Sequence, residues 1–143
     1  MYNNILVALD NSEFADRVMA EAIELAKTLN GKLTAVAVVD YSVMTYVDVN
    51  GPVVMPEVLE AIRDSYEIVL NKCRAEAEKA GVHFQQETLT GNPAGRILEY
   101  ADDNGVDLII LGHIGRSAAS QFLLGSVSHK VSNYAKCSVL IIK

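Results

Sequence analysis

The sequence predicts an α/β fold: a single domain, residues 1–143, with a doubly wound, five-stranded parallel sheet and helices on both faces. Short apolar runs alternate with longer segments in which apolar residues recur every three or four positions, in the order βαβαβαβαβ. The apolar runs are mostly continuous, which is typical of strands that are buried on both faces. Hydrophobic residues make up 50% of the chain, enough for a sizeable core.

The first elements are two buried strands joined by a helix. Residues Ile5–Leu9 and Leu33–Val39 are the apolar runs that predict the strands. Asn11 or Ser12 is suited to cap the helix between them, and Gly31 is expected to end it as a C′ glycine. The apolar positions of this helix are Ala15, Val18, Met19, Ala22, Ile23, Ala26 and Leu29.

The middle of the chain predicts a loop, a long helix and an edge strand. Residues 40–55 have no helical period and are interpreted as a long loop. Pro56 then opens a helix as an N1 proline, and Gly81 ends it. Residues Val82–Leu89 alternate and are more polar, as expected for an edge strand. The apolar stripe of the helix is Leu59, Ile62, Tyr66, Val69, Cys73, Ala77 and Ala80.

The last third predicts two more helix and strand pairs. Asn92-Pro93 is a cap followed by a helix start, and Asn104-Gly105 ends that helix. Val106–Gly112 is the next strand, and Ser138–Ile142 is the last. The apolar positions of the two helices are Ala94, Ile97, Leu98 and Ala101 in the first, and Val127, Val131 and Tyr134 in the second.

Charge and cysteine usage exclude several classes of function. With 12 basic and 18 acidic residues the net charge is −6, which argues against non-specific binding to nucleic acid or to anionic membranes. Cys73 and Cys137 have no disulfide-framework or metal spacing and are expected to be reduced. No signal peptide and no membrane-length apolar run is visible, so we expect a cytoplasmic protein that does not use a membrane.

Two connections that follow strands carry unusual residues. In a doubly wound sheet, ligands bind beyond the carboxyl ends of the strands, at the switch point. Asp10 lies directly after the first strand, where a carboxylate can accept hydrogen bonds from a ribose or a base amino group; the alternative is that it caps the following helix.

The second connection is the glycine- and serine-rich stretch "LGHIGRSAASQFLLGSVSHKV", residues 111–131. Gly112 and Gly115 allow close approach of backbone to a ligand. The free N–H groups at the last helix start, with the hydroxyls of Ser126 and Ser128, would point at one anion. Arg96 and Arg116 are candidates to neutralise phosphate charge; the alternative for each is a solvated surface arginine. The alternative is a flexible loop followed by an N-cap serine.

The spacing Gly112-x2-Gly115-x9-Gly125-Ser126 resembles the nucleotide-binding pattern of the ATP-binding universal stress proteins. The segments "NILVALDNSEFADRVMAEAIELA", "GNPAGRILEYADDNGVDLIILG" and "LLGSVSHKVSNYAKCSVLIIK" resemble the same family, so the likeness covers nearly the whole chain. It implies a Rossmann-like fold of the adenine-nucleotide alpha-hydrolase-like type. It also implies a stress-related nucleotide sensor or switch.

The resemblance assigns roles along the chain. It implies that the ligand is ATP, with AMP and ADP as alternatives, and that Mg²⁺ or Mn²⁺ lies on the phosphates. It further implies a homodimer through antiparallel pairing of the last strand, Ser138–Ile142, whose apolar edge would otherwise be exposed. The residues implied to bind are Ala8, Leu9 and Asp10 for adenosine, Val38 through its backbone for adenine, Gly112, Gly115 and Arg116 for ribose and phosphates, and Gly125, Ser126, Val127 and Ser128 for phosphates.

Motifs of dedicated enzymes are missing from the sequence. There is no GxxxxGK[ST] and no GxGxxG after the first strand. His83, His113 and His129 lack the spacing of metal ligands, and no third group completes a triad with Ser126 and His129. No carboxylate or lysine is recognisable as an activator of water beside a γ-phosphate, so no catalytic residue is assigned and binding is favoured over turnover. The open alternatives are a structural or interaction dimer with a vestigial nucleotide motif, and a slow ATPase or an enzyme acting on another adenylated ligand.

Overall fold

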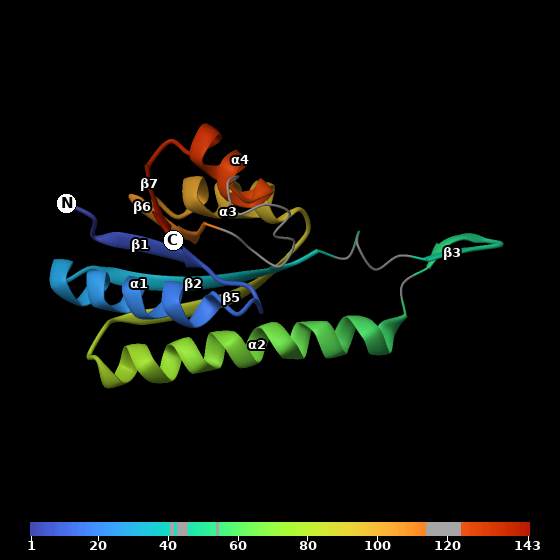
Figure 1. The fold of residues 1–143 in the computed structure, drawn as a ribbon, viewed down its shortest axis with the longest axis horizontal. Helices are drawn as coiled ribbons and strands as arrows, with labels where there is room; N and C mark the ends of the chain where they lie inside the picture. Colours follow the sequence, from blue (N-terminus) through green and yellow to red (C-terminus); the bar gives the residue numbers. More distant parts are fainter. Residues whose placement is uncertain (41, 43–45, 54, 114–123) are drawn as a thin grey trace.

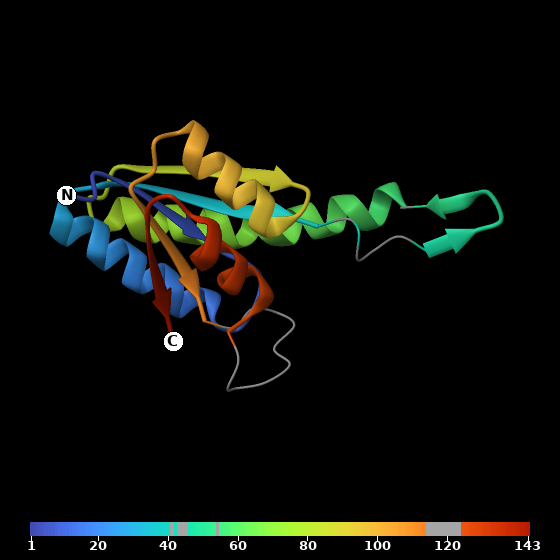
Figure 2. The ribbon, with the colours of Figure 1, turned by 90° about the horizontal axis from the view of Figure 1, so that it is seen from above.

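A computed structural model of the chain describes residues 1–40, 42, 46–53, 55–113 and 124–143. Five parallel strands form one sheet in the order β5-β2-β1-β6-β7, which confirms the predicted fold class. Figures 1 and 2 show the arrangement. The strands of the sheet are β1 (Asn4–Ala8), β2 (Lys32–Val39), β5 (Phe84–Thr90), β6 (Leu108–Gly112) and β7 (Ser138–Ile142); the helices are α1 (Ala15–Leu29), α2 (Pro56–Lys79), α3 (Pro93–Asp103) and α4 (Ser126–Tyr134).

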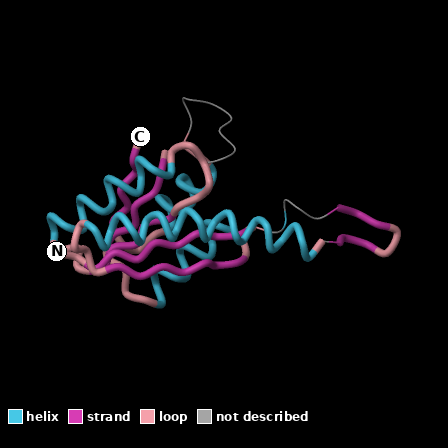
Figure 3. The backbone as a smooth tube through the Cα atoms, turned by 90° about the horizontal axis from the view of Figure 1, so that it is seen from below, coloured by secondary structure: helices cyan, strands magenta, loops and turns pink. Residues whose placement is uncertain are grey.

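Helices cover both faces of the sheet. Helices α1 and α2 lie on one face, which Figure 3 shows from below, and α3 and α4 lie on the other. Each face has its own apolar cluster because alternate residues of a strand point to opposite faces: Ile5 and Val7 pack with α1 and α2, whereas Leu6 packs with α3 and α4. The predicted core positions are largely confirmed, but Tyr134 is 73% exposed.

Several helix ends confirm the sequence signals. Pro56 and Pro93 are the first residues of α2 and α3. The side chain of Asn92 accepts a hydrogen bond from the backbone N–H of Gly95, as an N-cap does. Gly81 and Gly105 adopt the left-handed conformation just past α2 and α3, with φ of 75° and 63°.

At α1 the predicted capping roles were wrong, although the helix does end just before Gly31. Phe14 is the N-cap, with no side-chain cap bond. Ser12 lies before the helix, where its hydroxyl accepts from the N–H of Phe14 and its carbonyl from the N–H of Ala15. At the other end Asn30, not Gly31, adopts the left-handed conformation, with φ of 55°. A Cβ on Gly31 would lie 2.7 Å from the carbonyl oxygen of Tyr2, so this glycine is needed for close packing rather than for its φ.

The segment 40–55 is not only a loop. Strands β3 (Tyr46–Asp48) and β4 (Gly51–Val53) form an antiparallel hairpin, in which Asp48 pairs with Gly51. The two-residue loop of the hairpin is Val49-Asn50, and Gly51, the first residue of β4, has φ of 107°. The sequence interpretation did not use Asn50-Gly51 as a turn signal. Figure 1 shows the hairpin beyond the start of α2, away from the main sheet.

Strand β6 begins two residues later than predicted. The N–H of Val106 donates to the carbonyl of Ala101 at the end of α3, so this residue still belongs to the turn. The carboxylate of Asp107 accepts from the N–H groups of Asn3 and Asn4, which fixes β6 beside the start of β1. Among the helices that the structure describes, none is long and apolar enough to cross a bilayer.

Candidate functional site

The switch point of the sheet lies between β1 and β6. From β1 the chain goes to β2 on one side, and only after β5 does it return to the other side, to β6. Ala8 pairs with Val36, and Val7 with Ile110. If the same pairings are continued past the end of β1, Asp10 lies opposite Val38 of β2 on one side. On its other side Asp10 lies next to the residues that follow β6. The carboxyl ends of β1, β2 and β6 therefore meet at one edge, where such sheets bind ligands.

Asp10 forms a tight turn at this edge. Its Oδ1 accepts a hydrogen bond from the backbone N–H of Ser12, with an N···O distance of 2.9 Å. The carboxylate organises the connection from β1 to α1 without being the N-cap of α1, which is Phe14. No described residue donates to Oδ2, so this oxygen is available to a ligand that has a hydroxyl or an amino group.

Asp40 repeats this turn at the end of the neighbouring strand, β2. Its Oδ1 accepts from both the backbone N–H and the hydroxyl of Ser42, at 3.0 and 2.6 Å. The sequence interpretation did not assign Asp40 to the site. Asp40 follows a buried strand directly, which is the same sequence signal that singled out Asp10.

The start of α4 supplies hydrogen-bond donors. Its N-cap is Gly125, which has no side chain to cap the helix. The N–H groups of Ser126, Val127 and Ser128 occupy the first turn, and none of them donates to another described residue; the first donor with a partner inside the helix is His129, which bonds to Gly125. Three aligned donors and the positive end of the helix dipole favour an anion here.

Two hydrogen bonds join this helix start to the end of β6, and a third joins the residue after β6 to β7. The N–H of Gly125 donates to the carbonyl of His113 at 3.0 Å, and the N–H of His113 donates to the carbonyl of Ile142 at 2.8 Å. The hydroxyl of Ser128 donates to the carbonyl of Gly112 at 2.6 Å. The backbone role of His113 was missed by sequence reasoning, because a main-chain contact leaves no mark on residue type.

Most of the other predicted site residues lie at the same edge. Leu9 and Val38 are buried and Ala8 is half-buried, so these residues offer backbone rather than side chain to a ligand. Gly112 ends β6. Gly115 and Arg116 lie outside the described residues.

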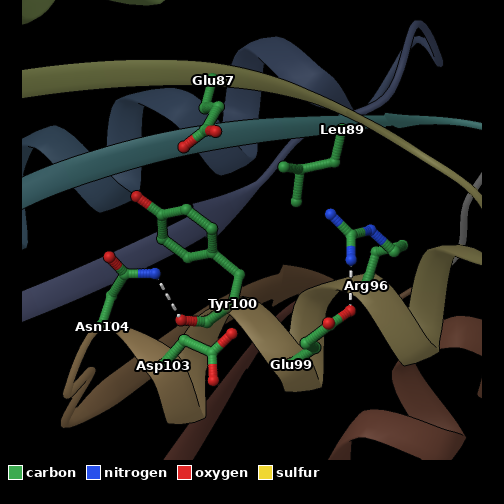
Figure 4. A pocket seen from close by; sticks show the side chains of 7 residues that line it. All are labelled: Glu87, Leu89, Arg96, Glu99, Tyr100, Asp103 and Asn104. Carbon is green, nitrogen blue, oxygen red and sulfur yellow. Dashed lines mark hydrogen bonds and ion pairs between the residues drawn. The ribbon is translucent and has the colours of Figure 1, made fainter.

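Arg96 lies elsewhere, in a side pocket between α3 and β5. Its guanidinium forms an ion pair with Glu99, so its charge is already compensated. Figure 4 shows it with the other side chains that line this pocket, which are Glu87, Leu89, Glu99, Tyr100, Asp103 and Asn104. The pKa of Tyr100 is raised there, first by burial and then by the adjacent carboxylate of Glu87. With three carboxylates around one paired arginine, this pocket does not suit a phosphate.

Metal-binding side chains do not converge in the described part of the chain. No group of three or more His, Cys, Asp or Glu residues is placed there to hold an ion. Cys73 is buried, and burial raises the pKa of its thiol to about 12, so this cysteine is protonated and unsuited to metal binding or nucleophilic chemistry at neutral pH.

Comparison with known proteins relates the whole chain to one family. Residues 1–143 match the family model described as the Universal stress protein family. The universal stress protein YxiE of Bacillus subtilis is 34% identical over 148 aligned positions, which cover 100% of both chains.

Solved structures give the same relationship. Universal stress protein UspA from Lactobacillus plantarum has a TM-score of 0.85 at 27% identity, covering 99% of this chain and 98% of that one. A universal stress protein in complex with cAMP has a TM-score of 0.73 at 24% identity, covering 99% and 96%. The universal stress protein from Archaeoglobus fulgidus in complex with dAMP has a TM-score of 0.71 at 23% identity, covering 99% and 98%. At these identities the last two likenesses establish a shared fold.

Proposed function

Because this chain belongs to the universal stress protein family, we propose that it binds an adenine nucleotide, and ATP in particular, at the carboxyl edge of its sheet. The observation that carries the proposal is the start of α4, where the N–H groups of Ser126, Val127 and Ser128 have no described partner beside the β1–β6 switch point. In the cell the protein would act as a stress-related sensor or switch whose state follows nucleotide occupancy.

The two halves of the ligand would meet different chemistry. The phosphates would lie on the first turn of α4, against its N–H groups and the hydroxyl of Ser126, with Gly112, Gly115 and Arg116 lining the approach as the family pattern implies. The nucleoside would lie toward β1 and β2. There Asp10 has a carboxylate oxygen free among the described contacts, and Ala8, Leu9 and Val38 present backbone.

Two proteins of the same fold support adenine recognition. One universal stress protein was determined with cAMP and another with dAMP. Since the described part of this chain holds no cluster of metal-binding side chains, a Mg²⁺ or Mn²⁺ ion would have to be held chiefly by the phosphates of the nucleotide.

Binding without dedicated turnover fits the described residues better than catalysis. The α4 donors that have no described partner are backbone groups, which bind an anion but cannot remove a proton from water. A slow ATPase and a non-binding interaction module remain the competing functions. ATP turnover on the order of 10 per second, which is typical of dedicated enzymes, would contradict the binding function and show that the protein is an enzyme.

The open edge of β7 supports a second proposal, a homodimer in the cytoplasm. Among the described strands β7 pairs only with β6, and Leu140 on it is 37% exposed. Antiparallel pairing with the same strand of a second copy would cover this edge. Sedimentation equilibrium at tens of micromolar, roughly the working range for a standard-size interface, tests it; a monomer would contradict it.

The direct test of function is calorimetric titration of the purified chain with ATP, ADP, AMP, inorganic triphosphate and adenosine. Mass spectrometry of the denatured protein identifies any ligand that copurifies. We expect ATP to bind most tightly, and triphosphate and adenosine each to bind more weakly. If none of the five compounds binds a folded sample, the proposed function is wrong and the interaction module takes its place.

A further inference from the structure

Ser128 differs from the other polar residues at the start of α4 in being buried. Ser128 is only 6% exposed, whereas Ser126 is exposed. The Oγ of Ser128 lies 2.6 Å from the carbonyl oxygen of Gly112, to which it donates. A serine hydroxyl has one proton, so a hydroxyl that donates to Gly112 cannot also donate to a phosphate oxygen.

This hydrogen bond connects two elements that are distant in sequence. Gly112 is sixteen residues before Ser128 and is the last residue of β6, where it pairs with Ile142 of β7. The backbone hydrogen bond from Gly125 to His113 lies one residue further along the same connection. The first turn of α4 is therefore held to the end of the sheet by one side-chain bond and one main-chain bond.

We propose that Ser128 is a positioning residue: its hydroxyl fixes the donors of the α4 first turn relative to the sheet and does not itself bind the phosphate. This inference deepens the proposed nucleotide function and rests on it. Three N–H groups bind an anion well only when all point at the same place, so a small rotation of α4 weakens every one of these contacts together. Gly112 needs no side chain for this role, because it accepts through its carbonyl.

Two other roles for Ser128 make different predictions. If its hydroxyl contacted phosphate directly, its removal would weaken binding without loosening the ligand-free protein. If the bond served fold stability alone, its removal would lower the melting temperature but leave the affinity of the folded protein unchanged. Only for a positioning role does removal of the hydroxyl both loosen the start of α4 in the ligand-free protein and weaken the affinity for phosphates.

The experiment compares Ser128→Ala with Ser128→Thr, which retains a hydroxyl, and with Ser132→Ala. Ser132 lies on the same helix, is exposed, and donates only to the carbonyl of His129, so it is a matched control. Residue-resolved amide hydrogen exchange is measured without ligand at Gly125 and His129, whose N–H groups are bonded at the helix start. Calorimetry then gives the affinities for ATP, triphosphate and adenosine, after circular dichroism has confirmed folding.

For Ser128→Ala we expect faster exchange at Gly125 and a loss of affinity of roughly three- to tenfold, equal for ATP and triphosphate, with adenosine unchanged. Ser128→Thr should restore both quantities, and Ser132→Ala should match the parent. If Ser128→Ala weakens binding but leaves exchange at Gly125 unchanged, the hydroxyl contacts the phosphate directly. If the affinity of Ser128→Ala is unchanged, the bond to Gly112 is purely structural. Either result overturns the proposal. If the parent binds no nucleotide the proposed function fails separately, and the positioning role is then decided by exchange at Gly125 alone.

Discussion

Helices α3 and α4 cover the same face of the sheet and pack against each other, yet they begin in opposite ways. The start of α3 satisfies most of its own donors: Pro93 has no N–H, the N–H of Gly95 donates to the side chain of Asn92, and that of Arg96 donates to the carbonyl of Asn92. The N–H of Ala94 alone is left without a described acceptor there. The start of α4 has a glycine N-cap without a side chain, and three N–H groups without a described partner. A capped helix start contributes to stability, whereas an uncapped one can accept an anion.

The surroundings of the two starts sharpen the contrast. The nearest charged group on α3 is Arg96, and its ion pair with Glu99 leaves little net charge. The start of α4 instead faces the switch point, with Asp10 on the neighbouring strand connection. Among the described residues no acceptor faces these three N–H groups of α4, and the proposed phosphate would supply one.

The largest effect is expected from giving α4 the kind of cap that α3 has. Gly125 has φ of −56° and ψ of 153°, a conformation open to any residue. In Gly125→Asp the new carboxylate would accept from the first-turn N–H groups and repel phosphate, so we expect ATP affinity to fall on the order of a hundredfold or more. Calorimetry measures the affinity, and thermal unfolding should show a stability within about 1 kcal/mol of the parent.

Gly125→Asn separates the cap from its charge. The asparagine side chain competes with phosphate for the same N–H groups of α4 but does not repel it. The loss of ATP affinity should therefore be smaller than in Gly125→Asp. Full ATP affinity in a folded Gly125→Asp protein would place the phosphates away from α4.

The second effect concerns the one exposed hydroxyl of the first turn. Ser126→Ala removes a donor to a charged group, which is worth about 1.5–3 kcal/mol, or very roughly a ten- to hundredfold loss of affinity for ATP and triphosphate. Adenosine should bind as before, and so should ATP to Ser126→Thr, which keeps the hydroxyl. An equal loss for adenosine would assign Ser126 to the nucleoside rather than to the phosphates.

Much of this contrast was visible in the sequence. Asn92-Pro93 predicts a self-capped helix from residue types alone, and Gly125-Ser126 predicts an open one. The strands were found because continuous apolar runs alternate with helical periods, and their order placed Asp10 and the start of α4 at one edge.

What the sequence did not predict depends on contacts between distant residues. Gly31 looked like a helix-ending glycine, but its role is set by the carbonyl of Tyr2. Ser126 and Ser128 look alike in the sequence, and only the carbonyl of Gly112 distinguishes the buried hydroxyl from the exposed one. Local propensity carries no information about such partners.

The third prediction tests how much the Asn92 cap of α3 contributes to the stability of the fold. Asn92→Ala removes the cap of α3 and should lower the free energy of unfolding by about 1 kcal/mol. Chemical denaturation measures this change, and Asn92→Asp, which can still cap, is the control. ATP affinity should stay at the parent value, because the donors freed at α3 lie beside the compensated Arg96–Glu99 pair. Weaker ATP binding would mean that α3 shapes the nucleotide site through its packing against α4.

The smallest effect is expected at Gly95, in the first turn of α3. A Cβ built there would lie 3.5 Å from Oδ1 and 3.9 Å from Cβ of Asn92, which are ordinary contacts, and the position is exposed. Gly95→Ala should therefore keep the Asn92 cap and raise the free energy of unfolding by roughly 0.5–1 kcal/mol, because alanine loses less backbone entropy than glycine on forming a helix. Denaturant titration detects such a gain, and calorimetry should find ATP affinity unchanged. A destabilised Gly95→Ala protein would mean that the glycine is required for the cap geometry, so that α3 depends on its first turn as closely as α4 does.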